Sequence, residues 1–297
     1  MPNGLAVTES LRRRYADLPP PVIVFCKSHS GSRLLARLMM AGGIWLGALR
    51  NDSEDSAQFL QLVEPLVKAY HPDWSRFFTQ NADEVEALAI QVIDTHLVHR
   101  PKDTPWGWKL CETGYILPFV HRVFPQARFV HLLRDGRDVA FCDHVAPRTP
   151  FWSKVYFDTD QISAWQGRGL SNRAYQRAPH IYNAQHWVNS VRLGRSYGAM
   201  LGAQYIELRY EDMVSAPLRF ATELMRRLGI ACHPEAFAPL LQTVRQDSLG
   251  KYRQESPRRV RQAMAVLRPM LEACRYGLEP PEQQHSLWRK IGMHFHA

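Results

Sequence analysis

The sequence has no uninterrupted run of apolar residues long enough to cross a bilayer. Its most apolar stretch, residues 34–49, is broken by Arg37 and by two adjacent glycines, whereas a membrane-spanning helix needs about 20 apolar residues in a row. Residues 1–17 are polar and carry three consecutive arginines, unlike the apolar core of a secretory leader. We therefore expect a cytoplasmic protein without a membrane span.

Cysteine is scarce and unevenly spaced. The 297 residues include five cysteines and no CxxC pair. An odd number without paired spacing favours free thiols in a reducing compartment over a disulfide scaffold.

Acidic residues are fewer than basic ones. There are 28 Asp and Glu against 37 Lys and Arg, a net charge of +9. A basic surface suits a polyanionic partner such as nucleic acid, a nucleotide or a sulfated ligand, without choosing among them. Hydrophobic residues make up 45% of the chain, which excludes a disordered protein and allows a large core.

Strand and helix patterns alternate along the chain. Short apolar segments predict strands at residues 22–26, 106–109, 128–133 and 205–208. Helical spacing follows from Leu34 up to Gly42 and at residues 57–69, 84–98, 116–124, 138–145, 183–201 and 216–228. This alternation predicts an α/β fold with a central parallel sheet flanked by helices, and ligands at the edge where the strands end.

The domain organisation is simple. We expect residues 1–20, which end in a proline-rich segment, to form a flexible N-terminal arm, and residues 21–297 to form a single domain. Residues 151–179 are rich in aromatic and polar side chains and lack clean periodicity, which predicts a lid or a substrate loop.

A small polar loop, residues 27–33, lies between the first predicted strand and the first helix. Such a loop exposes backbone N–H groups at a helix N-terminus, and that arrangement binds anions. Ser30, Ser32 and Arg33 add hydroxyl and guanidinium donors. The P-loop NTPase pattern GxxxxGK[ST] is absent, because no lysine follows Gly31. An ordinary strand-to-helix turn is the alternative interpretation.

Arg134 stands at the carboxyl end of the strand predicted at residues 128–133. This is the ligand edge of a parallel sheet, and a guanidinium there can bind a phosphate with two hydrogen bonds. A solvated charge at the end of a strand is the alternative.

Two motifs about a hundred residues apart resemble those of the sulfotransferase family, whose donor is 3′-phosphoadenosine 5′-phosphosulfate (PAPS). The first is similar to the family's (K/R)-S-G-T-T and reads His29-Ser-Gly-Ser-Arg33. The second is similar to R-D-P-R-D-V-A-x-S and reads Arg134-Asp-Gly-Arg-Asp-Val-Ala-Phe-Cys142. Weaker likenesses are Tyr210-Glu-Asp-Met to Y-E-D-L and the segment from Arg245 to R-K-G-x-x-G-D-W-K. The resemblance spans about residues 20–255 and implies a P-loop-like α/β fold of the sulfotransferase type.

The resemblance implies a donor site made from these motifs. The first loop would bind the 5′-phosphosulfate through Ser28, His29, Ser30, Gly31, Ser32 and Arg33. Arg134 and Cys142 occupy the positions that bind the 3′-phosphate, and Cys142 replaces the family's serine with a poorer hydrogen-bond donor. Tyr210 takes the place of a tyrosine packed against the nucleoside, and Arg245 that of a late arginine on the 3′-phosphate.

The resemblance also implies cations and a base for the transfer step. The family places Lys or Arg where this chain has His29, with Lys27 two residues earlier, and Lys109 matches a lysine that reaches the transferring group. Proton removal from the acceptor needs a base, and one branch of the family draws a glutamate from just after the first helix. Asp55 and Glu54 lie there, and the sequence does not order them. An acidic helix N-terminus is the alternative for this run.

The function expected is PAPS-dependent sulfuryl transfer to an acceptor hydroxyl or amine on a small molecule or glycan. We expect no metal, because no histidine pair has a third ligand at metal spacing, and no nucleic-acid partner, because no such motif accompanies the arginine patches. The alternatives are a P-loop-like nucleotide kinase or hydrolase and a catalytically degenerate nucleotide-binding protein of the same fold. The acceptor and the oligomeric state are not readable from the sequence.

Overall fold

Four strands form one parallel sheet in the computed structural model, which describes residues 3–142, 150–157, 177–245 and 247–277. Across the sheet they run in the order β2-β1-β3-β4, and their bounds are Gly107–Lys109 for β2, Val22–Cys26 for β1, Arg128–Leu133 for β3 and Tyr205–Arg209 for β4. The central pairing joins Val24 to Lys109 on one side and to Val130 on the other. The predicted parallel sheet is confirmed, and each strand lies within one residue of its expected position.

Helices connect the strands. They are α1 (Gly4–Arg14), α2 (Ser32–Ala41), α3 (Leu60–Tyr70), α4 (Ser75–Thr79), α5 (Asp83–Leu97), α6 (Leu117–Val123), α7 (Gly136–Ala140), α8 (Pro150–Phe157), α11 (Pro179–Leu201), α12 (Tyr210–Ser215), α13 (Pro217–Leu228), α14 (Ala238–Leu241) and α15 (Pro257–Ala273). Single 3₁₀ turns are η1 (Ala57–Phe59), η2 (Cys111–Ile116), η3 (Gly202–Gln204), η4 (Pro234–Phe237) and η5 (Lys251–Gln254). Within the described ranges, none of these helices has the length and apolarity that crossing a membrane requires.

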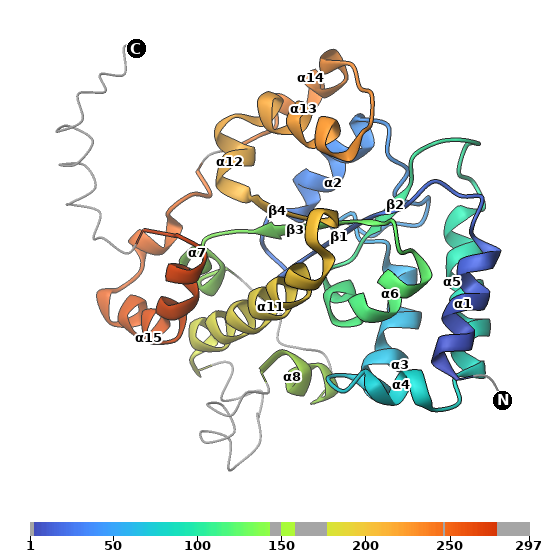
Figure 1. The fold of residues 1–297 in the computed structure, drawn as a ribbon. Helices are drawn as coiled ribbons and strands as arrows, with labels where there is room; N and C mark the ends of the chain where they lie inside the picture. The colour runs from blue at the N-terminus through green and yellow to red at the C-terminus, as the bar shows by residue number, and fades with distance from the viewer. Residues whose placement is uncertain (1–2, 143–149, 158–176, 246, 278–297) are drawn as a thin grey trace.

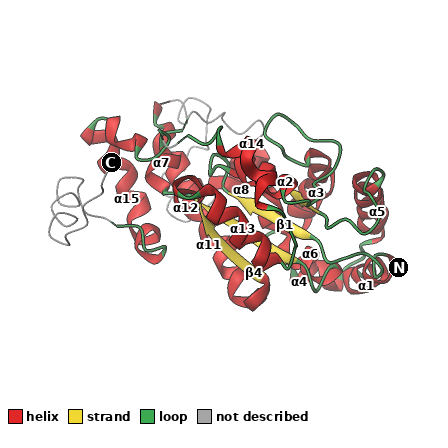
Figure 2. Ribbon diagram, turned by 90° about the horizontal axis from the view of Figure 1, so that it is seen from above, coloured by secondary structure: helices red, strands yellow, loops and turns green. Residues whose placement is uncertain are grey.

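Both faces of the sheet are covered, which explains why the central strand β1 is apolar throughout. In β1 every residue is buried, with Ile23 and Phe25 in one core and Val24 and Cys26 in the other. Helices α2, α12 and α13 lie over one face, and α6 and α11 lie over the other (Figure 1). Helices α1 and α15 occupy opposite ends of the molecule (Figure 2).

Two predicted segments extend outside the described residues. The helix expected at residues 138–145 is observed as α7, which begins two residues earlier and ends at Ala140. The predicted lid or substrate loop, residues 151–179, begins with α8 and ends at the start of α11. Its residues 158–176 lie outside the described part of the chain.

The expected flexible arm is instead largely helical. Residues 4–14 form α1, and Val7 and Leu11 on this helix are completely buried. Tyr15 follows on the same face, and its hydroxyl donates a 2.8 Å hydrogen bond to the Asp94 carboxylate of α5. The spacing of these three apolar side chains, four residues apart, is the helical signal that the neighbouring arginines and prolines concealed.

Helix α1 therefore contributes to the stability of the main core. We predict that Leu11→Ala lowers the free energy of unfolding by about 2–5 kcal/mol, because it removes a completely buried side chain. Leu5→Ala in the same helix is the control, since Leu5 is 44% exposed. Urea unfolding of the two variants measures the difference, and equal losses would contradict the packing of α1.

Candidate functional site

The loops after β1 and β3 leave the sheet in opposite directions. The chain passes from β1 to β2 on one side, and from β3 to β4 on the other. Such a divergence between neighbouring parallel strands opens a crevice at their carboxyl ends, which is where ligands bind in open α/β sheets. Lys27 directly follows β1 and Arg134 directly follows β3, so the two predicted motifs meet at this crevice.

The loop after β1 has the backbone form of an anion site. His29 has a φ of 69° and Gly31 a φ of 87°, both left-handed, and left-handed residues in a short loop are typical of backbone nests that bind anions. Helix α2 begins at Ser32 without a side-chain cap, so a bound anion would satisfy its first N–H groups. The buried Ser30 Oγ has no hydrogen-bond partner among the described residues, and a ligand oxygen would supply one.

Tyr210 fixes the shape of this loop from the other side. A Cβ atom at Gly31 would lie 2.2 Å from the Tyr210 ring, so only glycine fits against it. Tyr210 follows β4 at the start of α12, and its hydroxyl is 2.6 Å from the Ser248 hydroxyl. The ring thus joins the loop after β1 to residues 247–254, which we call the late segment.

Lys27 is a buried cation within the loop. Its side chain is 2% exposed, and its ammonium donates to the carbonyl and the hydroxyl of Ser28 at 3.2 and 3.1 Å. Burial lowers the pKa of Lys27 to about 8, because removing an ammonium from water disfavours its charged form. An anion bound in the loop would favour the protonated ammonium.

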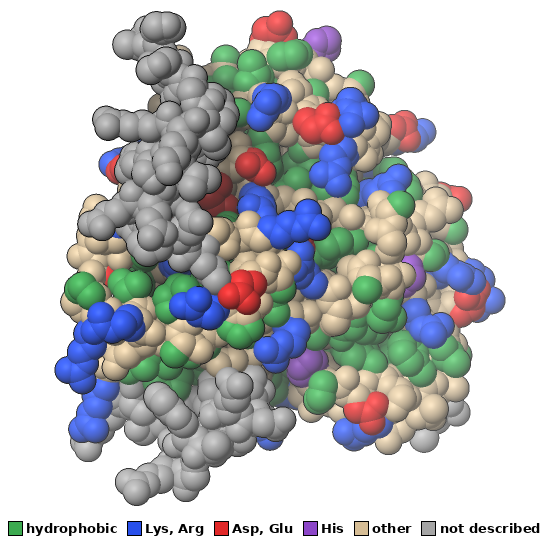
Figure 3. Space-filling model, turned by 60° about the vertical axis from the view of Figure 1, so that its left-hand side comes forward, with side chains coloured by type: hydrophobic (Ala, Val, Ile, Leu, Met, Phe, Trp, Pro, Cys, Tyr) green, Lys and Arg blue, Asp and Glu red, His purple; other side chains and the backbone are tan. Residues whose placement is uncertain are grey.

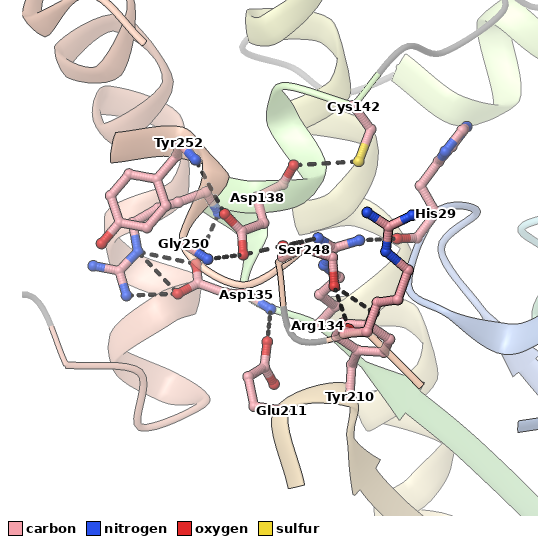
Figure 4. A network of polar contacts seen from close by, with 12 residues as sticks. His29, Arg134, Asp135, Asp138, Cys142, Tyr210, Glu211, Ser248, Gly250 and Tyr252 are labelled. Atoms are coloured by element: carbon pink, nitrogen blue, oxygen red, sulfur yellow. Dashed lines mark hydrogen bonds and ion pairs between the residues drawn. The ribbon is translucent and has the colours of Figure 1, made fainter. Parts of the chain in front are cut away.

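Arg134 crosses the crevice and holds three segments together (Figure 4). Its Nη1 donates to the His29 carbonyl at 3.1 Å, and its Nη2 donates to the Ser248 carbonyl at 2.5 Å. The guanidinium carbon lies 4.7 Å from the centre of the Tyr210 ring. The buried Nε has no partner among the described residues. Its Nη1 and Nη2 groups each bind one carbonyl, so the remaining N–H groups of the guanidinium are its donors for a phosphate.

The rest of the second motif braces the turn. Asp135 binds the Arg137 guanidinium through both carboxylate oxygens, at 2.6 to 3.1 Å. Asp138 accepts hydrogen bonds from the backbone N–H groups of Gly250 and Tyr252 at 2.8 and 3.2 Å. Figure 4 shows both carboxylates facing the late segment, with the His29 imidazole pointing away from Arg134.

A cavity of about 620 Å³ opens beside the loop and is wide enough for a nucleotide. Its lining includes Gly31, Arg33, Tyr210, Arg245 and Lys251. Figure 3 shows Lys and Arg side chains gathered near the middle of one face of the molecule, with a few carboxylates among them. Positive side chains on this face favour an anionic ligand there.

Lys109 and Asp55 form a buried ion pair near the end of β2. The Lys109 ammonium is 2.6 Å from an Asp55 carboxylate oxygen and 2.9 Å from the Ser53 carbonyl. Burial opposes the charge, but the sulfurs of Cys111 and Cys26 and the Asp55 carboxylate outweigh it and raise the pKa of Lys109. The pair joins two of the predicted catalytic residues.

Glu54 is turned to different partners. Its carboxylate accepts hydrogen bonds from Arg37 at 3.0 Å and from Arg50 at 3.1 Å. Burial acts against ionisation, but these two guanidinium groups prevail and lower the pKa of Glu54. Of the two candidates that the sequence left equal, Asp55 is the one beside Lys109.

Residues 20–235 match the sulfotransferase family. The chain belongs to this family. Similar solved structures include the sulfotransferase domain of the Synechococcus PCC 7002 olefin synthase, with 17% identity, a TM-score of 0.50 and coverage of 88% of this chain and 96% of that domain. A mouse sulfotransferase complexed with PAP has 11% identity, a TM-score of 0.45 and coverage of 86% and 85%. No curated protein matches the sequence. At these identities the likeness concerns the fold alone.

In this sulfotransferase-family chain, two side chains expected to contact the donor, those of Cys142 and Arg245, have other partners in the structure. The Cys142 thiol donates to the carbonyl of Asp138, four residues earlier in the chain, at 3.3 Å. Burial raises the pKa of the Cys142 thiol. The Arg245 side chain is 80% exposed and pairs with Asp247 at 2.5 Å. Each side chain must exchange its present partner before it contacts a ligand.

Glu112 is a polar residue near the site to which the sequence analysis assigned no role. It follows Cys111 at the end of β2, and the Tyr156 hydroxyl donates to its carboxylate at 2.8 Å. Burial raises the pKa of Glu112. Its position three residues after Lys109 was the available signal, but neither periodicity nor a family motif marked it.

The close contact between Gly31 and Tyr210 yields a test. We predict that Gly31→Ala destabilises the protein more than Gly43→Ala does. Both glycines have left-handed backbones, with φ of 87° and 92°, so both variants pay a strain of about 1–2 kcal/mol. Only Gly31→Ala adds a clash, because nothing lies within 4 Å of a Cβ atom at Gly43. Urea unfolding compares the two, and equal losses would show that Tyr210 does not restrain the loop.

Proposed function

We propose that this chain transfers a sulfuryl group from PAPS to an acceptor hydroxyl or amine. The observation that carries the proposal is the anion cradle at the β1–β3 crevice. There the buried Ser30 hydroxyl has no hydrogen-bond partner within the described part of the chain, α2 begins without a side-chain cap, and Lys27 and Arg134 supply positive charge. Membership of the sulfotransferase family supports the reaction class.

The donor would lie with its 5′-phosphosulfate in the loop and its nucleoside in the neighbouring cavity. Ser28, His29, Ser30, Gly31, Ser32 and Arg33 would hold the phosphosulfate through backbone N–H groups and side chains. Tyr210 and Arg245 line the cavity, and Arg134 enters the crevice beside them, so the three can hold the nucleoside and the 3′-phosphate. Cys142 can assist only after its thiol leaves the Asp138 carbonyl.

Sulfuryl transfer is an in-line displacement in which negative charge grows on the leaving phosphate and on the equatorial oxygens, as in phosphoryl transfer. Fixed cations aimed at that charge provide most of the catalysis. Lys27, within the loop, would face the leaving phosphate, and Lys109, at the end of β2, would face the sulfuryl oxygens. As Lys109 turns toward those oxygens, Asp55 is released to accept the proton of the acceptor.

Binding of the desulfated product 3′-phosphoadenosine 5′-phosphate (PAP) tests the donor site. Calorimetric titration should show that PAP binds, that ATP with Mg²⁺ does not, and that Arg134→Ala loses about 1.5–3 kcal/mol of binding free energy. Arg128→Ala, at the other end of β3, is the control. A preference for ATP with Mg²⁺ would favour a kinase or hydrolase, and PAP binding without any sulfate transfer would favour a degenerate binding protein.

The buried ammonium of Lys27 should make PAP binding depend on pH. An anion prefers the protonated lysine, whose pKa is about 8 in the free protein, while the phosphates of PAP are already ionised above about pH 7. We predict constant affinity from pH 7 to about 8 and a fall approaching tenfold per unit above that. Lys27→Met should bind weakly at every pH and lose this fall. If PAP affinity falls in the same way in Lys27→Met, a group other than Lys27 causes the pH dependence.

The same substitution should stabilise the free protein. Lys27 binds fewer protons folded than unfolded between its folded pKa of about 8 and its ordinary value of 10.5, so at neutral pH its burial costs stability, on the order of 1–3 kcal/mol. Thermal unfolding of Lys27→Met without ligand should occur at a higher temperature. Lys68→Met, on a lysine that is 52% exposed, should change little.

Asp55 and Glu54 provide a matched pair for the base. Once an acceptor is found by screening with labelled PAPS, Asp55→Asn should lower kcat by about 10²- to 10⁴-fold while PAP affinity is kept. Glu54→Gln should have little effect on kcat, because its carboxylate is held by Arg37 and Arg50. The reverse order of effects would remove Asp55 from the role of base.

A further inference from the structure

Two thiols that the proposed transfer does not use meet at the edge of the candidate site. Cys26 is the last residue of β1, and Cys111 lies two residues beyond the end of β2. Their sulfur atoms are 3.3 Å apart. Both cysteines are free thiols.

The sheet register explains this contact. Val24 pairs with Lys109, and Cys26 and Cys111 each lie two residues further along, Cys26 as the last residue of β1 and Cys111 as the first residue of η2, so the two side chains meet where the strands end. Neighbouring strands lie about 4.8 Å apart, which is within the Cα separation of about 4.4–6.8 Å that a disulfide spans. The two strand ends therefore lie within the separation that a disulfide bridges, and the sulfurs need only a small local movement to bond.

The surroundings assign different roles to the two thiols. The hydrogen bond from Cys111 is the main cause that lowers the pKa of Cys26, and the Lys109 ammonium adds to it against the effect of burial. The same hydrogen bond and burial raise the pKa of Cys111. Cys26 is thus the better thiolate nucleophile, and Cys111 is the neighbouring resolving thiol.

We propose that Cys26 and Cys111 form a reversible disulfide on exposure to hydrogen peroxide, and that this bond weakens the anion site, a consequence that rests on the proposed function. The Cys26 thiolate attacks peroxide, an S–O bond forms, the O–O bond breaks and hydroxide leaves. Cys111 then attacks the sulfenic acid, so that the S–S bond forms and the S–O bond breaks. The sum is two thiols and one peroxide giving one disulfide and two waters.

The bond would act on the site through the adjoining residues. The sulfurs must close from 3.3 Å to about 2.05 Å, a movement of about 1.2 Å between the end of β1 and the start of η2. Lys27 is the next residue after Cys26, and Ser32 at the start of α2 donates to the Cys26 sulfur. The anion loop, residues 27–33, begins at the residue after Cys26, and Lys109 lies two residues before Cys111. Both therefore adjoin the cysteines that move.

The experiment treats the full-length protein with hydrogen peroxide, blocks the remaining thiols and identifies disulfide-linked peptides by mass spectrometry. Each sample is then titrated with PAP before and after dithiothreitol. We expect a linked Cys26–Cys111 peptide, an affinity for PAP about tenfold lower, equivalent to one lost charge-assisted hydrogen bond, and recovery on reduction. Cys111→Ser should abolish the linked peptide and the loss, and Cys232→Ser, at a half-exposed cysteine elsewhere, should change neither.

Separate results overturn the two proposals. Absence of the linked peptide, or sulfinic acid on either cysteine in its place, would refute the disulfide. A linked peptide with unchanged PAP affinity would refute its effect on the anion site. Failure of the untreated protein to bind PAP would refute the proposed function instead, and the linked peptide would still decide the thiol chemistry.

Discussion

The guanidinium of Arg134 is the contact on which the candidate site depends. It joins the loop after β1, through the His29 carbonyl, to the late segment, through the Ser248 carbonyl, while lying over the Tyr210 ring. These groups come from parts of the chain more than a hundred residues apart in sequence. A planar group with five donors in a fixed fork can bind carbonyls of two separate segments and still stack on an aromatic ring. The shape of the anion loop is consequently set by tertiary contacts rather than by the loop alone.

Burial of positive charge is the second feature of the site. Lys27, Lys109 and Arg134 are each between 2% and 6% exposed, although isolated buried cations are costly. Lys109 is compensated by Asp55 at 2.6 Å, whereas the Arg134 guanidinium is 3.9 Å from the Asp138 carboxylate. Among the described residues, Lys27 donates hydrogen bonds to the two oxygens of Ser28. The uncompensated charge at the β1–β3 crevice is what makes this place attractive to a polyanion.

The departures from the family motifs have consistent local explanations. Cys142 stands where the family has a serine, and its thiol bonds to a carbonyl of its own turn. The second motif keeps its shape without that hydroxyl, because Asp135, Arg137 and Asp138 brace the turn against the late segment. Cys26 and Cys111 bring a pair of thiols into contact where the strands end. These cysteines add thiol chemistry to the edge of the crevice.

The positions of the four strands and of the anion loop follow from the sequence alone. Four apolar segments predicted the strands to within one residue, because a buried parallel strand must be apolar on both faces. A loop of small residues ahead of an apolar helix likewise marked the crevice, since that order of elements gives a helix N-terminus at the sheet edge.

The pairing of side chains, in contrast, depends on contacts between elements that are distant in sequence. In the folded chain residues 4–14 form a helix, Asp55 rather than Glu54 lies beside Lys109, and Cys26 contacts Cys111. Local patterns report the environment of one segment, so they cannot tell which of two adjacent carboxylates meets a lysine more than fifty residues away. That choice follows from strand register and from the packing of distant elements, which exist only in the folded chain.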